Sequence, residues 1–206
     1  MKITVNNLQK KFGRQHILQN ISFELQPGTK NVILGANGSG KSTLLKILSG
    51  ALEASDHPPV YEHADQSIEP KQVGKYCGIA APYVALNPMF TLTETLDFHA
   101  KMCGFHPDFE RGAWLEKAGL SEHKNKRLSS FSSGMQQRVR LILAVANERP
   151  LLLLDEPTSN LDKDGVAFYK DLVASFYQDK TVLVASNHMA HEYEFCTEEI
   201  KLEKHY

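Results

Sequence analysis

The stretch Gly35-Ala36-Asn37-Gly38-Ser39-Gly40-Lys41-Ser42-Thr43 decides the fold. It matches the pattern G-x-x-x-x-G-K-[ST] at every fixed position. An apolar run at residues 31–34 precedes it and predicts a buried strand, and apolar residues at helical spacing follow it up to Gly50. Strand, glycine loop and helix stand in the order that this pattern requires. The stretch therefore predicts an α/β fold that binds a nucleotide phosphate.

The loop has the chemistry of an anion site. Its glycines let backbone N–H groups curl around phosphate oxygens, and the following helix points its positive end at the same anion. Lys41 adds a mobile positive charge for the outer phosphates, and the Ser42 hydroxyl is placed to ligate Mg²⁺. The residues expected to bind the nucleotide are Gly35, Asn37, Gly38, Ser39, Gly40, Lys41, Ser42 and Thr43.

The composition of the chain limits the classes of protein to which it can belong. The chain has 206 residues with 23 basic and 24 acidic side chains, so nothing indicates a broad nucleic-acid-binding surface, and we expect no nucleic-acid partner. Cys77, Cys103 and Cys196 are far apart, which indicates neither a disulfide framework nor a zinc site and favours a reducing cytosol. We expect no signal peptide, because Met1 leads directly into an alternating pattern. The longest apolar stretches are far shorter than the ~18 residues of a spanning helix.

The rest of the chain reads as strands around a helical insertion. Antiparallel strands are expected at residues 2–5 and 21–25, with Phe12 in the loop between them. Residues 53–72 predict an irregular connection or a short edge strand. Helices are expected from the capping box at Thr91 to Gly104, at 108–117, at 133–147 and at 165–177, and buried strands at 151–154 and 181–185. In the first helix, Leu92, Leu96 and either Met102 or Cys103 should face the core.

Two adjacent carboxylates follow the leucine strand at residues 151–154. The carboxyl ends of parallel strands form the edge where open α/β sheets bind ligands. Asp155 there suits Mg²⁺ held through its water shell, and Glu156 suits polarisation of an attacking water. A glutamate base makes hydrolysis the natural reaction, rather than transfer to a substrate hydroxyl.

With these residues in place, the sequence resembles the ATP-binding cassette (ABC) ATPases over nearly its whole length. Residues 131–138, Phe-Ser-Ser-Gly-Met-Gln-Gln-Arg, resemble the family signature Leu-Ser-Gly-Gly-Gln followed by x-Gln-Arg. Residues 159–162, ending in Asp162, resemble the D-loop. His188 stands in the place of the switch histidine, and Phe12 in that of the aromatic that stacks on adenine.

The resemblance implies a site shared between two subunits. In the family, the signature Ser132 and Gly134 would face the γ-phosphate bound by the other subunit, so that two ATP molecules lie between head-to-tail partners. The residues alone leave ordinary alternatives open: Ser132 as a helix cap, Phe12 as a cover for the edge of the core, and His188 as a hydrogen-bonded polar residue. The resemblance gives His188 contact with the γ-phosphate and orientation of Glu156.

The sequence departs from the family at two places. Pro82 stands where the family has a glutamine that touches Mg²⁺ and the attacking water, and proline offers neither a polar side chain nor an N–H. We expect the loop to keep its mechanical role while that Mg²⁺ contact is lost or passes to water. In the signature, Phe131, Ser133 and Met135 replace the usual Leu, Gly and Gln, whereas Ser132 and Gly134 remain.

The resemblance implies the ATP-binding, ATP-hydrolysing subunit of an ABC transporter. It would form a dimer with a second copy or a homologous ATPase subunit and would drive a separate membrane-spanning permease, docked near residues 82–90. It would lie in the cytoplasm, peripheral on the cytoplasmic face of the membrane. The alternative is a soluble ABC-type ATPase that serves a non-transport assembly, similar to the ATPase of iron–sulfur cluster assembly.

The expected fold class is α/β. It comprises a P-loop core with a mostly parallel sheet, an N-terminal antiparallel β subdomain and an inserted α-helical subdomain. The resemblance makes residues 1–206 one ABC ATPase domain, with the nucleotide-binding core and β subdomain at about 1–90 and 151–206 and the helical signature subdomain at about 91–150.

Overall fold

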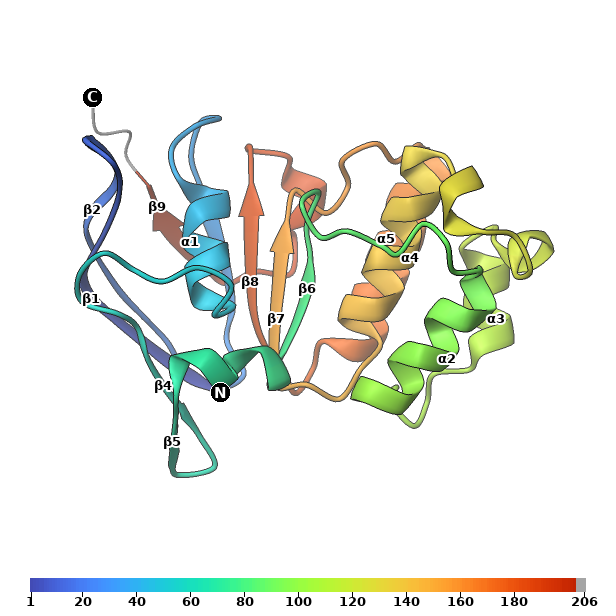
Figure 1. Cartoon of the computed structure of the whole chain (residues 1–206), viewed down its shortest axis with the longest axis horizontal. Coiled ribbons are helices and arrows are strands. Elements are labelled where there is room, and N and C mark those ends of the chain that lie inside the picture. The colour runs from blue at the N-terminus through green and yellow to red at the C-terminus, as the bar shows by residue number, and fades with distance from the viewer. Residues whose placement is uncertain (203–206) are drawn as a thin grey trace.

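A computed structural model describes residues 1–202. Its core is a parallel sheet in the order β6-β7-β8-β3-β9 (Figure 1). Residues that alternate along the central strands face opposite sides of this sheet, and both sides are buried. The strands are β3 (Lys30–Leu34), β6 (Cys77–Ala80), β7 (Leu151–Asp155), β8 (Thr181–Ser186) and β9 (Glu198–Lys201).

A second, antiparallel sheet has the order β2-β1-β4-β5. Its strands are β1 (Lys2–Phe12), β2 (Gln15–Leu25), β4 (Val60–His63) and β5 (Gln66–Ile68). The first two are much longer than the strands predicted at 2–5 and 21–25, because a hairpin with shifts in register carries polar residues along its exposed face. The prediction that Phe12 lies in the connecting loop was wrong, since Phe12 ends β1 and pairs with Gln15.

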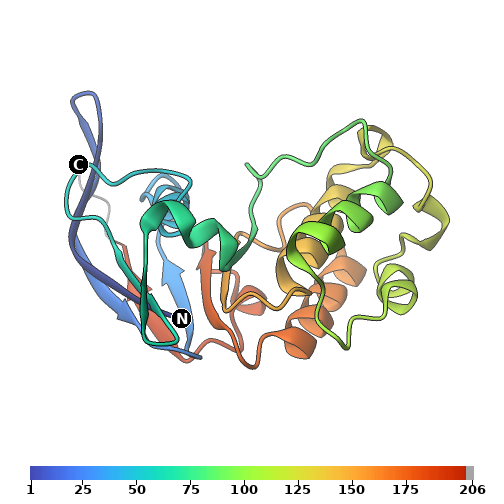
Figure 2. The same cartoon turned by 60° about the horizontal axis from the view of Figure 1, so that its bottom comes forward.

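One helix is enclosed between the two sheets, two helices pack on the opposite side of the parallel sheet, and two more lie beyond them. Helix α1 (Lys41–Leu48) packs in one apolar cluster with both sheets. Helices α4 (Ser133–Val145) and α5 (Lys163–Phe176) share the other cluster, and α2 (Leu92–Cys103) and α3 (Arg111–Lys117) lie at the far end of the molecule (Figures 1 and 2). Parallel core, antiparallel sheet and inserted helices confirm the predicted architecture.

Most of the predicted helices are confirmed, with shifted ends. The capping box at Thr91 is formed in full, and Gly104 ends α2. Of the two alternatives for its core-facing end, Met102 was wrong, because its side chain is 66% exposed whereas Cys103 is half-buried. Helix α3 begins three residues late, after a turn in which the Phe109 N–H donates to the carbonyl of His106.

Several short elements had no clear signal in the sequence. Strands β6 and β9 are each four residues long. Segment 53–72 contains the hairpin β4–β5, in which β5 is the edge strand that the sequence allowed and β4 pairs with β1. Short 3₁₀ turns complete the chain: η1 (Pro70–Lys75), η2 (Ser121–His123), η3 (Leu128–Ser130) and η4 (Ala190–Glu192).

Gly78 sets how closely α4 can approach the edge strand β6. A Cβ atom at this position would lie 2.2 Å from the carbonyl oxygen of Ala144 on α4. That atom belongs to the helix backbone, so it cannot move aside as a flexible side chain could. The absence of a side chain at Gly78 therefore allows the helix to lie directly on the strand.

Replacing Gly78 by alanine should lower the free energy of unfolding by about 3 kcal/mol, because the added methyl group pushes α4 away from β6. Gly112→Ala is the matched control, since a Cβ there meets nothing within 4 Å and the residue is helical. Urea denaturation of both variants measures the effect. Equal unfolding midpoints for the two variants would contradict the close-approach explanation.

Candidate functional site

The phosphate loop joins β3 to α1 and is shaped by its glycines. Gly40 has φ +97°, and a Cβ atom there would lie 2.6 Å from Cδ2 of Leu18. At Gly35, a Cβ atom would lie 2.6 Å from the Ser39 hydroxyl. Gly40 thus requires glycine for its left-handed backbone, and a Cβ at Gly35 would also lie 3.0 Å from the main-chain carbonyl oxygen of Leu202. The N–H of Leu44 donates to the carbonyl of Gly40, so the helix begins at the loop.

Lys41 lies inside this loop rather than out in solvent. Its side chain is 5% exposed, and its ammonium donates to the main-chain carbonyls of Gly35 (2.5 Å) and Ala36 (3.2 Å). These two hydrogen bonds keep the Lys41 ammonium inside the loop, close to the amino end of α1. Such a charge can exchange carbonyl oxygens for phosphate oxygens with a small movement of the side chain.

The loop opens into a cavity of about 560 Å³. Glu156, at the end of β7, lines the same cavity, so the structure brings the expected base to the expected phosphate site. Two lining residues had no signal in the sequence, Gln15 and Ile17 of β2. Only the folded hairpin places them there. The loop residues in the lining are Asn37, Gly38, Gly40, Lys41, Ser42 and Thr43.

Asp155 is buried beside the loop, with 2% of its surface exposed. Burial raises the pKa of its carboxyl, and the hydrogen bond from the Ser42 hydroxyl opposes that shift. Its Oδ2 atom is buried and has no hydrogen-bond partner among residues 1–202. An unpartnered carboxylate oxygen next to a hydroxyl is the oxygen donor set that Mg²⁺ prefers. The residues present therefore fit this ion.

Glu156 and His188 follow adjacent strands and share an uncommon backbone conformation. Glu156 has φ 45° and His188 has φ 59°, both in the left-handed region. The N–H of Glu156 donates to the carbonyl of Ala185 at 2.9 Å, which extends the pairing of β7 with β8. The His188 side chain is exposed, and it is not among the described residues that line the cavity.

The signature residues lie at the amino end of α4, outside this cavity. The Ser132 hydroxyl accepts the N–H of Met135 as a helix cap, and the N–H groups before it have no partner within the helix. A Cβ atom at Gly134 would lie 2.8 Å from the carbonyl oxygen of Asn160, so the signature rests against the expected D-loop of its own chain.

Asp162 is engaged by protein groups on two sides. Its carboxylate accepts the N–H of Gly165 (2.8 Å), which caps α5, and forms an ion pair with Arg138 of α4 (2.6 Å). The hydrogen bond from Gly165 and then the Arg138 charge hold the pKa of this carboxyl below its usual range. The structure thus links the D-loop to the signature helix through Asp162, and nucleotide contact by Asp162 stays a prediction.

The expected adenine-stacking residue stands at the tip of the first hairpin. Phe12 is 51% exposed, and the Lys10 ammonium lies 4.9 Å from the centre of its ring. Phe12 is not in the described lining of the cavity, although its hairpin partner Gln15 is.

Pro82 is exposed two residues after β6 ends. The Lys46 ammonium lies 4.2 Å from the centre of the ring of its neighbour, Tyr83.

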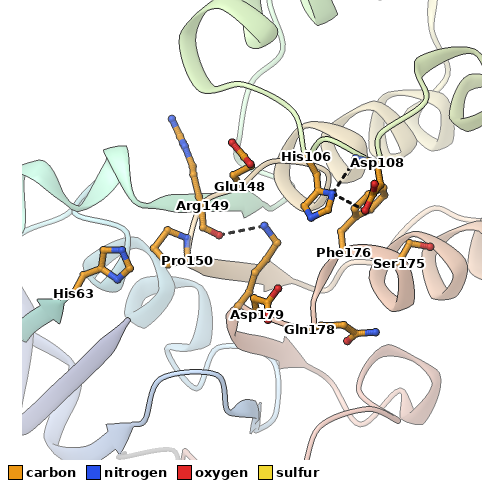
Figure 3. A pocket seen from close by; sticks show the side chains of 11 residues that line it. His63, His106, Asp108, Glu148, Arg149, Pro150, Ser175, Phe176, Gln178 and Asp179 are labelled. Carbon is orange, nitrogen blue, oxygen red and sulfur yellow. Dashed lines mark hydrogen bonds and ion pairs between the residues drawn. The ribbon is translucent and has the colours of Figure 1, made fainter.

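A second cavity lies at the opposite edge of the sheet, at the amino ends of β7 and β8 (Figure 3). Its charged groups have both signs, with Asp108, Glu148 and Asp179 beside Arg149 and Lys180. The Lys180 ammonium donates to the carbonyls of Asn147 and Arg149, and burial lowers its pKa to about 8. Lys180 thus links the segment before β8 to the segment before β7. The mixed charges of the cavity favour no particular class of ligand.

The parallel sheet, the glycine loop that opens α1 and the carboxylates at the end of β7 define a nucleoside triphosphate-binding protein of the P-loop class. The chain belongs to the ABC transporter family, whose model matches residues 18–159. It is accordingly an ATP-binding protein and an ATP hydrolase of the ABC class.

Known ABC proteins match most of the chain. An uncharacterized ABC transporter ATP-binding protein of Bacillus subtilis (strain 168), YybJ, is 32% identical over 90% of this chain and 85% of its own length. The lantibiotic transport ATP-binding protein SrtF of Streptococcus pyogenes is 28% identical over 93% of this chain and 82% of its own length.

A solved structure confirms the fold. The dimeric bacterial ABC transporter cassette MJ0796 superposes with a TM-score of 0.79, covering 98% of this chain and 94% of that one at 24% identity.

Proposed function

We propose that this chain is the ATP-hydrolysing subunit of an ABC transporter, which dimerises around two ATP molecules to drive a separate membrane-spanning permease. One observation carries the proposal. The phosphate loop and Glu156 share a cavity, whereas the described lining of that cavity does not include Ser132 or Gly134. This separation suits a dimer in which the signature of one chain completes the phosphate site of the other.

The proposed chemistry is hydrolysis of the bond between the β- and γ-phosphates. Glu156 accepts a proton from a water that attacks the γ-phosphorus, the bond to the bridging oxygen breaks, and ADP leaves with inorganic phosphate. Lys41 stabilises the negative charge on the outer phosphates. His188, on the neighbouring loop, contacts the γ-phosphate and orients Glu156. Mg²⁺ held by Ser42 and Asp155 would neutralise part of the phosphate charge.

The proposed dimer is head to tail. Ser132 and Gly134 at the amino end of α4 bind the γ-phosphate that a second copy holds in its phosphate loop, because a helix N-terminus attracts an anion. The cap on Ser132 fixes the direction of the first turn of α4. The solved MJ0796 cassette is dimeric, which supports a dimer here as well.

The proposed docking surface for the permease includes the loop after β6 and part of α2. Met89 of the loop is 62% exposed, and Phe98 and Met102, one helical turn apart on α2, are 56% and 66% exposed. The Phe90 ring packs edge-on against Phe98, which joins the loop to the helix. Leu86, by contrast, packs against the core. An exposed apolar surface of this kind suits a protein partner.

None of the helices in the described part of the chain is long and apolar enough to span a bilayer. In the proposed transporter, a separate polypeptide spans the membrane and holds this chain at the cytoplasmic face. Two relatives, the linearmycin resistance protein LnrL and the lantibiotic transport protein SrtF, are named for resistance and transport. Their names favour a transporter role over a non-transport assembly.

A Glu156→Gln variant should bind ATP without hydrolysing it and should accumulate as a dimer when ATP and Mg²⁺ are present. Size-exclusion chromatography with light scattering measures the mass, and phosphate release measures turnover. Lys41→Ala is the control, because loss of the phosphate-binding charge should keep the chain monomeric. A Glu156→Gln protein that stays monomeric and hydrolyses ATP at the parental rate would contradict the proposal.

A Phe98→Glu variant should lose association with membranes, because a charge replaces an aromatic ring in the docking surface, while ATP hydrolysis by the isolated chain stays unchanged. Sedimentation of cell membranes followed by immunodetection measures the association. Val60→Glu is the control, since Val60 is 51% exposed on β4, away from α2. Equal membrane association of parent and Phe98→Glu would rule out this surface.

A further inference from the structure

Glu192 is a buried carboxylate that the proposed hydrolysis does not use. It ends the short turn η4 after β8, and 2% of its surface is exposed. Oε1 accepts hydrogen bonds from the N–H (3.1 Å) and hydroxyl (2.7 Å) of Thr158, and Oε2 accepts the hydroxyl of Ser186 (2.5 Å). A carboxylate is buried at high cost unless such bonds are made, so all three bonds matter to the local structure.

The donors to Glu192 lie close in the chain to the two proposed reacting residues, Thr158 in the loop after β7 and Ser186 at the end of β8. Thr158 follows Glu156 by two positions, and Ser186 precedes His188 by two positions. Glu156 and His188 both have positive φ, a conformation that persists only where the surroundings enforce it. A single carboxylate therefore joins the loop that follows Glu156 to the end of β8, just before the loop of His188.

Both hydroxyls in this network donate to the Glu192 carboxylate. The Thr158 hydroxyl gives its single proton to Glu192, so Nε2 of His191, 2.9 Å from that hydroxyl, must be the donor to it. The Ser186 hydroxyl likewise gives its proton to Glu192 and accepts the N–H of Met189 at 3.2 Å. The network thus extends from Glu192 to the residue after His188.

The backbone of Glu192 is itself anchored from the other side. The Tyr169 hydroxyl on α5 donates to the carbonyl oxygen of Glu192 at 2.6 Å, and both groups are buried. On the loop after Glu156, the side chain of Gln137 on the signature helix donates to the carbonyl of Pro157 at 2.9 Å. The carboxylate thus connects a loop fixed to the signature helix with a loop fixed to α5.

We propose that Glu192 is a positioning residue for ATP hydrolysis, which holds Glu156 and His188 in register with each other across the ends of β7 and β8. This inference rests on the proposed roles of those two residues. Glu192 is outside the described lining of the nucleotide cavity, so it acts through the loops and makes no contact with ATP. Its loss should therefore change turnover more than nucleotide affinity.

The test compares Glu192→Gln with the parent chain. Glutamine keeps the shape, but its amide nitrogen cannot accept a hydrogen bond, so either Thr158 or Ser186 loses its acceptor. We expect kcat to fall about tenfold or more, because small misplacements of reacting groups have effects of this size. The KM for ATP and the affinity for a fluorescent ATP analogue should change less than about threefold.

Glu194→Gln is the matched control. Glu194 lies two residues away, and its carboxylate is exposed and paired with Lys170 at 2.8 Å. This variant should keep the parental kcat. If Glu192→Gln does not fold, Thr158→Val and Thr158→Ser decide the same point, because only serine keeps the hydroxyl that reaches Glu192. Valine should then lower kcat, and serine should preserve most of it.

Three results would overturn the inference, and they are distinguishable. If Glu156→Gln abolishes hydrolysis while folded Glu192→Gln, or Thr158→Val in its place, keeps the parental kcat, Glu192 does not position the site. If Glu156→Gln itself hydrolyses ATP at the parental rate, the proposed base is wrong and the role of Glu192 fails with it. A fall in affinity equal to the fall in kcat/KM, with kcat unchanged, would also contradict positioning.

Discussion

Strand β8 pairs in parallel with β3 on one side and β7 on the other, and the geometry of the site depends on this pairing. Parallel strands end at the same edge, so the phosphate loop after β3, the carboxylates after β7 and the loop of His188 after β8 all emerge together. Every residue of β7 and β8 is buried, which fixes their register on both faces. A slip of one residue would turn each apolar side chain to the wrong cluster.

Close approach between backbones extends this order to the helices. Gly78 lets α4 lie on β6, and Gly134 lets the start of α4 rest against the carbonyl of Asn160. The ion pair between Arg138 and Asp162 joins the same two segments. The orientation of the signature helix is thus set by the chain that follows Glu156. In the proposed dimer, the chain that follows Glu156 would connect it to the surface that meets the second subunit.

The sequence was informative where one local signal sufficed. The phosphate loop, the capping box at Thr91 and the buried leucine strand each combine a recognisable pattern with a fixed spacing, and the structure has all three. It was uninformative where long-range pairing decides the conformation. The outer half of the first hairpin has polar residues on its open face, and β6 and β9 are too short to show periodicity.

The same division applies to the site. Lys41, Ser42, Asp155 and Glu156 could be predicted from the motif and its place in the chain, and the structure gathers them at one end of α1. Gln15, Ile17 and Glu192 could not, because nothing near them in the sequence marks them. The buried carboxylate becomes visible only when the loops after β7 and β8 fold against each other.

The central proposal is that each ATP site is completed by a second copy of the chain. Mixing two inactive variants tests it most directly: Lys41→Ala, which lacks the phosphate-binding charge, and Ser132→Arg, which blocks the signature. A mixed dimer contains one intact site, built from the loop of one chain and the signature of the other. We expect the mixture to hydrolyse ATP faster than either variant alone. A rate equal to the weighted average of the two at every mixing ratio would contradict the shared site.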